Sequence, residues 1–189
     1  MIKKIFKFLG LFVSAVILLF IAARLAGYRA MRFPADSQGL SMYPTFSPGD
    51  IWLCRMKRGY TSSDLSPGMT IMFPKENFGF LLTKRIIALE NQTVAVSEAG
   101  TFVDGKIIEE PYAFHSGEKP SGINRPHEAS VVEAMRVPPG TLFVMGDNRD
   151  NSFDSRDPKF GFVNVEDIVG KPILILWAKD KRRIGKSMR

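Results

Sequence analysis

The distribution of apolar residues divides the chain into one long apolar segment and a body of short apolar runs. No charged residue lies between Phe8 and Ala23, and a basic residue flanks the segment on each side. A transmembrane helix needs about 20 residues, and the segment reaches this length if the flanking cations extend toward the lipid headgroups. We therefore predict a transmembrane anchor over residues 8–28, after a basic N-terminus at 1–7.

A removable signal peptide is the competing interpretation, because such peptides also combine a basic start with an apolar stretch. The sixteen uncharged residues slightly exceed that usual stretch, and Arg24 interrupts the small residues at which cleavage would occur. Both observations favour an anchor that is kept. Three basic residues precede the segment and three follow it before residue 33, so the charge count does not orient the helix.

The body consists of short apolar runs separated by turn residues, which is typical of β structure. The expected strands are 51–55, 69–73, 80–89, 93–96, 131–137, 141–145 and 171–178. Asp104-Gly105 predicts a tight hairpin over 102–107, because these residues tolerate the positive φ angles of the turn. No run beyond the apolar segment keeps a helical period, so we predict a mainly β, antiparallel domain over 29–178. Residues 110–130, rich in Pro and Gly, predict a long surface loop.

Charge is concentrated at the two ends of the chain. Residues 1–32 carry six basic and no acidic side chains, and 179–189 carry six basic and one acidic, so the net charge of +7 leaves −4 for 33–178. An acidic body argues against a nucleic-acid partner. The basic tail at 179–189 suits contact with anionic membrane lipids, or is a solvated terminus. One cysteine and two histidines give no disulfide framework and no zinc motif, so we expect no metal and no cofactor.

Three segments combine polar and small residues that can carry chemistry. In the first, Ser41 precedes a turn fixed by Pro44, which places a hydroxyl on a rigid backbone. A serine is a weak nucleophile and needs a nearby base. The alternative is an ordinary loop serine that hydrogen-bonds its own backbone.

The second segment places Lys84 within an apolar strand, with Arg85 on the opposite face. If Lys84 points inward, burial lowers its pKa by up to ~3–5 units, which leaves a neutral amine that can accept a proton. In the alternative interpretation Lys84 faces solvent and Arg85 forms a salt bridge.

The third segment, 145–156, is mostly polar and follows an apolar strand directly. Three of its aspartates resemble a calcium loop, but no glutamate closes the loop at the required spacing. A network without metal is the better interpretation: Asp154 pairs with Arg156, and Ser152 hydrogen-bonds a neutral lysine. Taken alone, the same residues also fit a solvated turn.

Together the three segments resemble the sequence boxes of the type I signal peptidases, which are membrane-anchored Ser–Lys endopeptidases. Residues 41–45 (SMYPT) resemble the nucleophile box of that family, and residues 84–87 (KRII) resemble its general-base box. Residues 146–156 (GDNRDNSFDSR) resemble its longest signature. Their order after an N-terminal anchor is also that of the family.

The resemblance implies a role for each matching residue. Ser41 would be the acylating nucleophile, and Lys84 the base that later protonates the leaving amine. Ser152 would orient Lys84, and the backbone N–H of Ser41 would contribute to the oxyanion hole. Gly39 stands where some members carry a serine hydroxyl. The residues expected to support this loop are Asp147, Asp154 and Arg156.

The resemblance also implies a substrate and a location. Substrates would be preproteins with small residues, typically Ala-X-Ala, before the cut, because shallow apolar pockets exclude larger side chains. Met42, Phe46 and Thr83 are the candidates to line these pockets. The enzyme would be a single-pass protein of the bacterial cytoplasmic membrane, with 1–7 in the cytoplasm and the catalytic domain on the outer side.

Two other hypotheses remain open at this point. Thr83 and the segment 88–91 depart from the usual family sequence. The altered segment 88–91 and the short chain leave room for a dedicated maturase of pilins, conjugation proteins or organelle inner-membrane proteins. A membrane-anchored β domain that binds a partner without catalysis would instead keep Ser41 and Lys84 apart.

Overall fold

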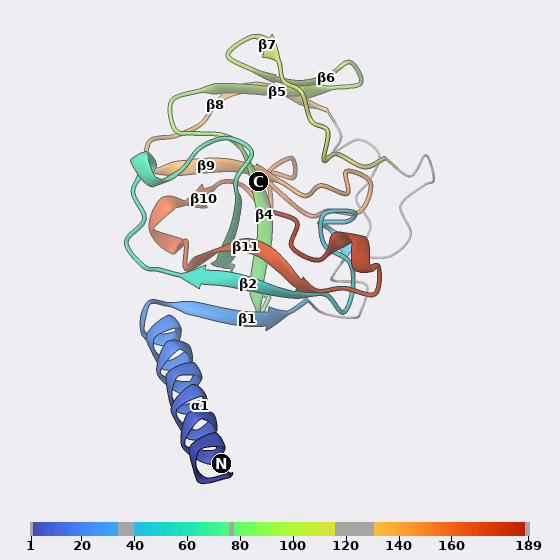
Figure 1. The fold of residues 1–189 in the computed structure, drawn as a ribbon. Helices are drawn as coiled ribbons and strands as arrows, with labels where there is room; N and C mark the ends of the chain where they lie inside the picture. Colours follow the sequence, from blue (N-terminus) through green and yellow to red (C-terminus); the bar gives the residue numbers. More distant parts are fainter. Residues whose placement is uncertain (1, 34–39, 76–77, 116–130, 188–189) are drawn as a thin grey trace.

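The computed structural model describes residues 2–33, 40–75, 78–115 and 131–187, and begins with a helix that projects from a β body (Figure 1). Helix α1 spans Ile2–Leu25, and its segment Ile5–Leu25 is long and apolar enough to cross a membrane. The helix therefore ends before residue 28, the expected end of the anchor. Gly27 makes this junction, with a φ of 87° and no room for a Cβ beside the carbonyl of Met56.

A seven-stranded antiparallel sheet forms the larger part of the described body. Its strands are β1 (Tyr28–Arg32), β2 (Ile51–Met56), β11 (Gly170–Trp177), β3 (Thr70–Pro74), β4 (Leu81–Ala88), β9 (Thr141–Met145) and β10 (Val163–Asn164), in that spatial order. The strand β1, which follows α1, lies at one edge and pairs with β2. Strand β4 lies inside the sheet between β3 and β9, so both of its edges are hydrogen-bonded.

A smaller sheet lies at the end of the molecule far from α1 (Figure 1). Its strand order is β7 (Lys106–Ile107), β6 (Gly100–Val103), β5 (Thr93–Ser97) and β8 (Val132–Arg136). Asp104 and Gly105 have φ angles of 50° and 75° between β6 and β7, which confirms the predicted hairpin. Short 3-10 turns lie at Ser62–Asp64, Val165–Asp167 and, as η5, at Lys181–Arg183.

The mainly β fold class is confirmed, and each expected run contains a strand. The sequence did not predict β1 and β10. Strand β1 is a five-residue edge strand that carries two arginines, and β10 is two residues long, so neither has an apolar run to reveal it.

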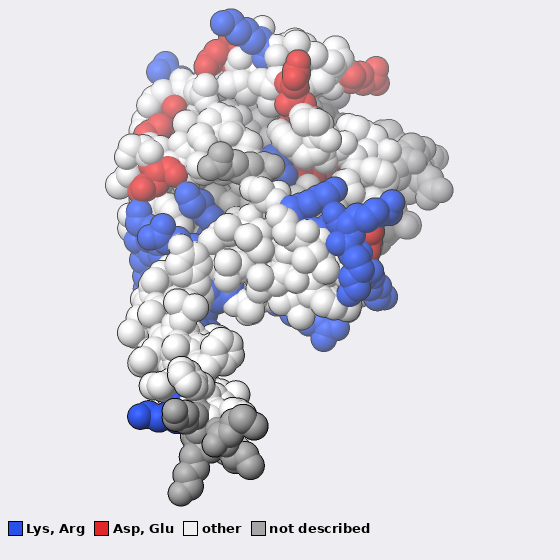
Figure 2. Space-filling view, in the orientation of Figure 1, with Lys and Arg blue, Asp and Glu red and all other residues white. Residues whose placement is uncertain are grey.

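The tail of the molecule is folded rather than a solvated terminus as far as Ser187. After β11 the chain forms η5 and returns, so that the N–H of Gly185 donates to the carbonyl of Ile175 at 2.8 Å. Leu174 and Ser187 form an antiparallel bridge. Lys and Arg side chains gather where η5 lies in the same orientation (Figure 2). This region is basic, as the composition predicts, and hydrogen bonds join it to the body although most of its side chains are exposed.

Candidate active site

The segment that carries Ser41 is a turn held from below by two buried side chains. Met42 and Phe46 have no exposed surface, and Phe46 packs on Phe33 and Trp52 with ring centroids 5.3 and 4.9 Å apart. Ser41 itself is partly exposed. Burying two large apolar side chains stabilises the turn by about 1.5–3 kcal/mol each, which fixes the backbone on either side of the serine.

This packing corrects the expected pocket for two of its three residues. Met42 and Phe46 belong to the hydrophobic core, together with Met72 and Ile175, and present no surface to a substrate. A sequence pattern does not distinguish an apolar residue beneath a turn from one that lines an open pocket. Thr83 is buried as well, within β4.

Lys84 points into the body from the middle of β4. Its side chain is 3% exposed, and its Nζ donates a hydrogen bond to Ser152 Oγ at 2.9 Å. Pairing on both edges of β4 fixes the backbone from which the amine extends. The alternative of a solvent-facing lysine is therefore wrong.

Gly146 is the point at which the three segments meet. The N–H of Asn148 donates to the carbonyl of Ser41 at 3.1 Å, which joins the serine turn to the loop after β9. A Cβ on Gly146 would lie less than 3.0 Å from both the Ser41 carbonyl oxygen and Ser152 Oγ. Ser41, Ser152 and the Lys84 amine that Ser152 holds therefore form one cluster around this glycine.

A buried ion pair closes the loop that carries Ser152. Arg156 donates to both carboxylate oxygens of Asp154, at 2.9 and 3.0 Å, and the N–H of Gly146 donates to Asp154 Oδ2 at 2.9 Å. One carboxylate thus links the beginning of the loop to its end. This is the Asp154–Arg156 contact that the sequence suggested.

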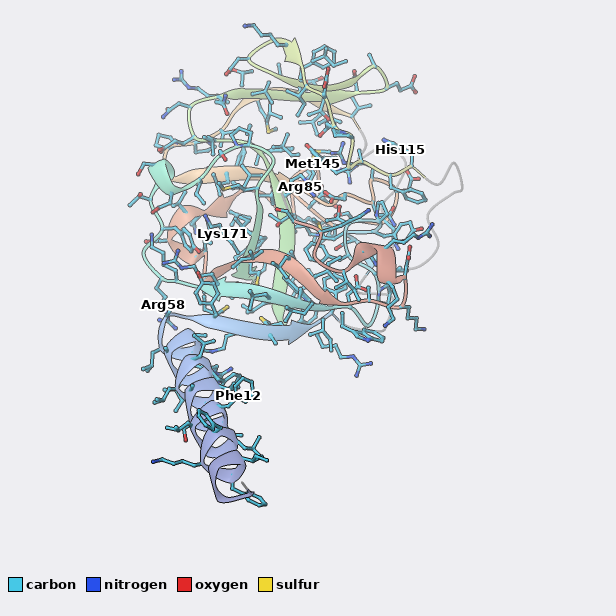
Figure 3. All side chains as sticks on the ribbon, in the orientation of Figure 1. Phe12, Arg58, Arg85, His115, Met145 and Lys171 are labelled. Atoms are coloured by element: carbon cyan, nitrogen blue, oxygen red, sulfur yellow. The ribbon has the colours of Figure 1, made fainter. Side chains whose placement is uncertain are left out.

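A second ion pair lies on the other face of β4. Arg85 donates to both oxygens of Asp147, at 2.7 and 2.6 Å, and the pair is almost completely buried. Thr45 Oγ1 also donates to Asp147, at 2.5 Å, so this carboxylate connects β4 to the serine turn. Arg85 lies beside its strand-pairing partner Met145 at the centre of the molecule (Figure 3). Asp147 therefore holds this region together through Arg85, which forms the salt bridge that the sequence analysis expected only if Lys84 faced solvent.

The segment 110–115 packs against the site, although it was expected to belong to a surface loop. Tyr112 lies 4.0 Å from the Arg85 guanidinium, ring centroid to Cζ, and Glu110 forms a double hydrogen bond with Arg149 at 2.9 and 2.6 Å. Burial raises the pKa of Glu110, but the hydrogen bonds and charge of Arg149 outweigh it and hold this pKa below its usual value. Residues 116–130 of the expected loop lie outside the described residues, as does Gly39.

The aspartates of this region do not converge on a metal site. Among the described residues, no three His, Cys, Asp or Glu side chains come together as possible ligands. Asp147 and Asp154 each face an arginine instead. Electrostatic neutralisation in this loop therefore comes from guanidinium groups.

A partly exposed serine on a fixed turn, beside a buried lysine held by a second serine, is the arrangement expected of serine hydrolases that use a lysine base. The model of the family described as signal peptidase, peptidase S26, matches residues 5–177.

Individual relatives carry the corresponding name. Signal peptidase I of Bacillus caldolyticus is 34% identical over 146 residues, covering 74% of this chain and 76% of that protein. Signal peptidase I of Mycobacterium tuberculosis (strain H37Rv) is 36% identical over 117 residues, covering 57% of this chain and 40% of that protein. A crystal structure of a signal peptidase I from Enterococcus faecalis is 28% identical, with a TM-score of 0.44, covering 57% of this chain and 95% of that one.

The chain belongs to the signal peptidase family, peptidase S26, and is an enzyme, a serine peptidase. This membership supports signal-peptide cleavage as its activity and excludes the non-catalytic binding domain.

Proposed function

We propose that this chain removes signal peptides from exported preproteins with a Ser41–Lys84 dyad. The observation that carries the proposal is the cluster around Gly146, where the buried Lys84 amine is held by Ser152 next to the turn of Ser41. Burial disfavours the charged form of an amine, and a general base must be neutral to accept a proton.

The chemistry follows from these positions. Ser41 Oγ attacks the scissile carbonyl carbon while its proton passes to Lys84 Nζ, and the backbone N–H of Ser41 stabilises the oxyanion. The C–N bond then breaks as Lys84 returns the proton to the leaving amine. Lys84 next removes a proton from water, which attacks the ester carbon. The C–O bond to Ser41 then breaks as Lys84 returns the proton to Ser41 Oγ, which regenerates the enzyme. Ser152 orients the amine throughout, and the pairs of Asp147 and Asp154 with arginines hold the surrounding loop.

Small residues before the cut, in the pattern Ala-X-Ala, are the proposed specificity. Thr83 precedes the base on β4 and stays a candidate for the pocket wall. Met42 and Phe46 are fully buried in the core and are not part of the proposed pocket wall. A shallow pocket discriminates against each added methylene by about 1–3 kcal/mol.

We further infer that α1 anchors the enzyme in a bacterial cytoplasmic membrane, with residues 1–7 in the cytoplasm and the β domain outside. Support comes from the length and exposure of α1, none of whose spanning window is buried in the molecule. Anionic lipids are proposed partners of the basic surface around η5.

Cleavage of an Ala-X-Ala preprotein in detergent tests this function, with wild type, Ser41→Ala and Lys84→Ala compared by the N-terminal sequence of the product. We expect wild type to cut after the second alanine and both variants to be inactive while folded. Cleavage by folded Ser41→Ala would contradict the dyad. An inactive, folded wild type would favour a maturase with a restricted substrate set.

A further inference from the structure

The C-terminal segment makes direct contact with the turn that carries Ser41. Arg183, in η5, donates through Nη2 to the carbonyl of Thr45 at 2.7 Å and to that of Pro44 at 3.2 Å. The same guanidinium pairs with Asp50, with a closest separation of 2.9 Å. The Arg183 side chain is 15% exposed and that of Asp50 is 2% exposed, so the contact is partly buried.

Asp50 extends the effect of Arg183 to the far end of the same segment. Its carboxylate accepts a hydrogen bond from the N–H of Ser47 at 2.8 Å, and its own N–H donates to the carbonyl of Ser47 at 3.1 Å. One guanidinium thus contacts the segment at Pro44 and Thr45 and, through Asp50, at Ser47. The Thr45 hydroxyl donates a hydrogen bond to Asp147.

We propose that Arg183 is a positioning residue, which keeps the turn of Ser41 in the geometry that lets its hydroxyl reach Lys84. This inference rests on the proposed role of Ser41 as nucleophile. Arg183 lies beyond residue 177, where the match to the family model ends.

The neighbouring Arg182 is a basic residue of the same segment that pairs locally instead of with the serine turn. Its guanidinium is 88% exposed and pairs with Asp180, two residues away in the same segment. Loss of Arg182 removes the same charge as loss of Arg183 without touching the serine turn. Arg182→Gln is therefore the matched control for Arg183→Gln.

The test uses the full chain in detergent, with the Ala-X-Ala preprotein as substrate. We expect Arg183→Gln to lower kcat by about 10- to 100-fold, because small displacements of a reacting group have effects of this size. KM should stay within about twofold, since Arg183 bonds backbone carbonyls of the turn and is assigned no contact with the substrate. Arg183→Lys should recover part of kcat, because an ammonium can pair with Asp50 but lacks the planar fork.

Three results would overturn the inference: an unchanged kcat in Arg183→Gln, an equal fall in Arg182→Gln, or a change in KM alone. Thermal unfolding midpoints identify a temperature at which all variants are folded. If Arg183→Gln does not fold, Arg183→Lys carries the test, and a wild-type kcat in that variant overturns the role. Ser41→Ala in the same assay separates the proposed dyad from the positioning role of Arg183. If Ser41→Ala is inactive while the Arg183 variants keep the wild-type kcat, only the positioning role is wrong.

Discussion

Two adjacent residues of β4 place a cation on each face of the same strand, and the surroundings differ. The Lys84 side chain is 3% exposed and donates to a hydroxyl, that of Ser152. The Arg85 side chain is 1% exposed and is bonded twice to a carboxylate, that of Asp147. Both are buried, and the double hydrogen bond of Arg85 to a carboxylate suits a permanent charge.

These two neighbouring residues therefore suit different purposes, Lys84 a chemical one and Arg85 a stabilising one. A lysine amine can lose its proton when buried, whereas a guanidinium keeps its charge in proteins. The Lys84 face therefore suits proton transfer, and the Arg85 face suits a fixed link among β4, the loop after β9 and the serine turn. Replacing Lys84 by an apolar side chain of similar length should therefore affect mainly cleavage. The same replacement of Arg85 should affect mainly the free energy of unfolding.

The largest effect is expected for Lys84→Met. Methionine fills an irregular buried space well, so the free energy of unfolding should change by less than about 1.5 kcal/mol. Cleavage should fall by about 10²- to 10⁴-fold, because the proposed general base is lost. Preprotein cleavage and urea unfolding, followed by the fluorescence of the buried Trp52, measure the two quantities. Retained cleavage would place the base elsewhere.

Arg85→Met should produce the opposite balance. It leaves Asp147 as a buried carboxylate without its cation, which lowers the free energy of unfolding by about 3–5 kcal/mol. Urea unfolding measures this loss. Arg58→Met serves as the control, because Arg58 is exposed and its loss should change stability by less than about 0.5 kcal/mol. A small loss in Arg85→Met would mean that water or another cation reaches Asp147.

Sequence alone could predict the Lys84 face far better than the Arg85 face. Ser41, Lys84 and Ser152 occur in short boxes whose residue types and order indicate their chemistry. The Asp154–Arg156 contact is also local, since these residues are two apart. The β class could be predicted from runs bounded by Pro-Gly turns.

Contacts that depend on the tertiary fold could not be predicted in this way. Arg85 and Asp147 are 62 residues apart, and Arg149 and Glu110 are 39 apart. Nothing local indicates that the Pro-containing segment at 110–115 packs on an arginine, or that Arg183 returns to the serine turn. The prediction that Met42 and Phe46 line the substrate pocket was wrong for a related reason. An apolar side chain close to Ser41 in the sequence can face either the substrate or the core.

The smallest of the three effects is expected for Glu110. Tyr112 packs on the Arg85 guanidinium and donates a hydrogen bond to Glu110, and so links Arg85 to the Glu110–Arg149 pair. Glu110→Gln should lower the free energy of unfolding at pH 7 by about 1.5–3 kcal/mol, the range for hydrogen bonds to charged groups. Because the pKa of Glu110 is lowered by folding, its contribution is present above the usual value of 4.5 and disappears as pH falls through the lowered value.

The difference between wild type and Glu110→Gln should therefore shrink as the pH of the urea unfolding experiment falls below 4.5. Glu109→Gln is the matched control, since Glu109 is the adjacent carboxylate and its side chain is exposed. It should show little difference from wild type at any pH. A Glu110→Gln difference that stayed constant with pH would show that packing, rather than the charge of the pair, stabilises this end of the face. Arg85 and Asp147 would then be the part of the face at which ionic pairing matters.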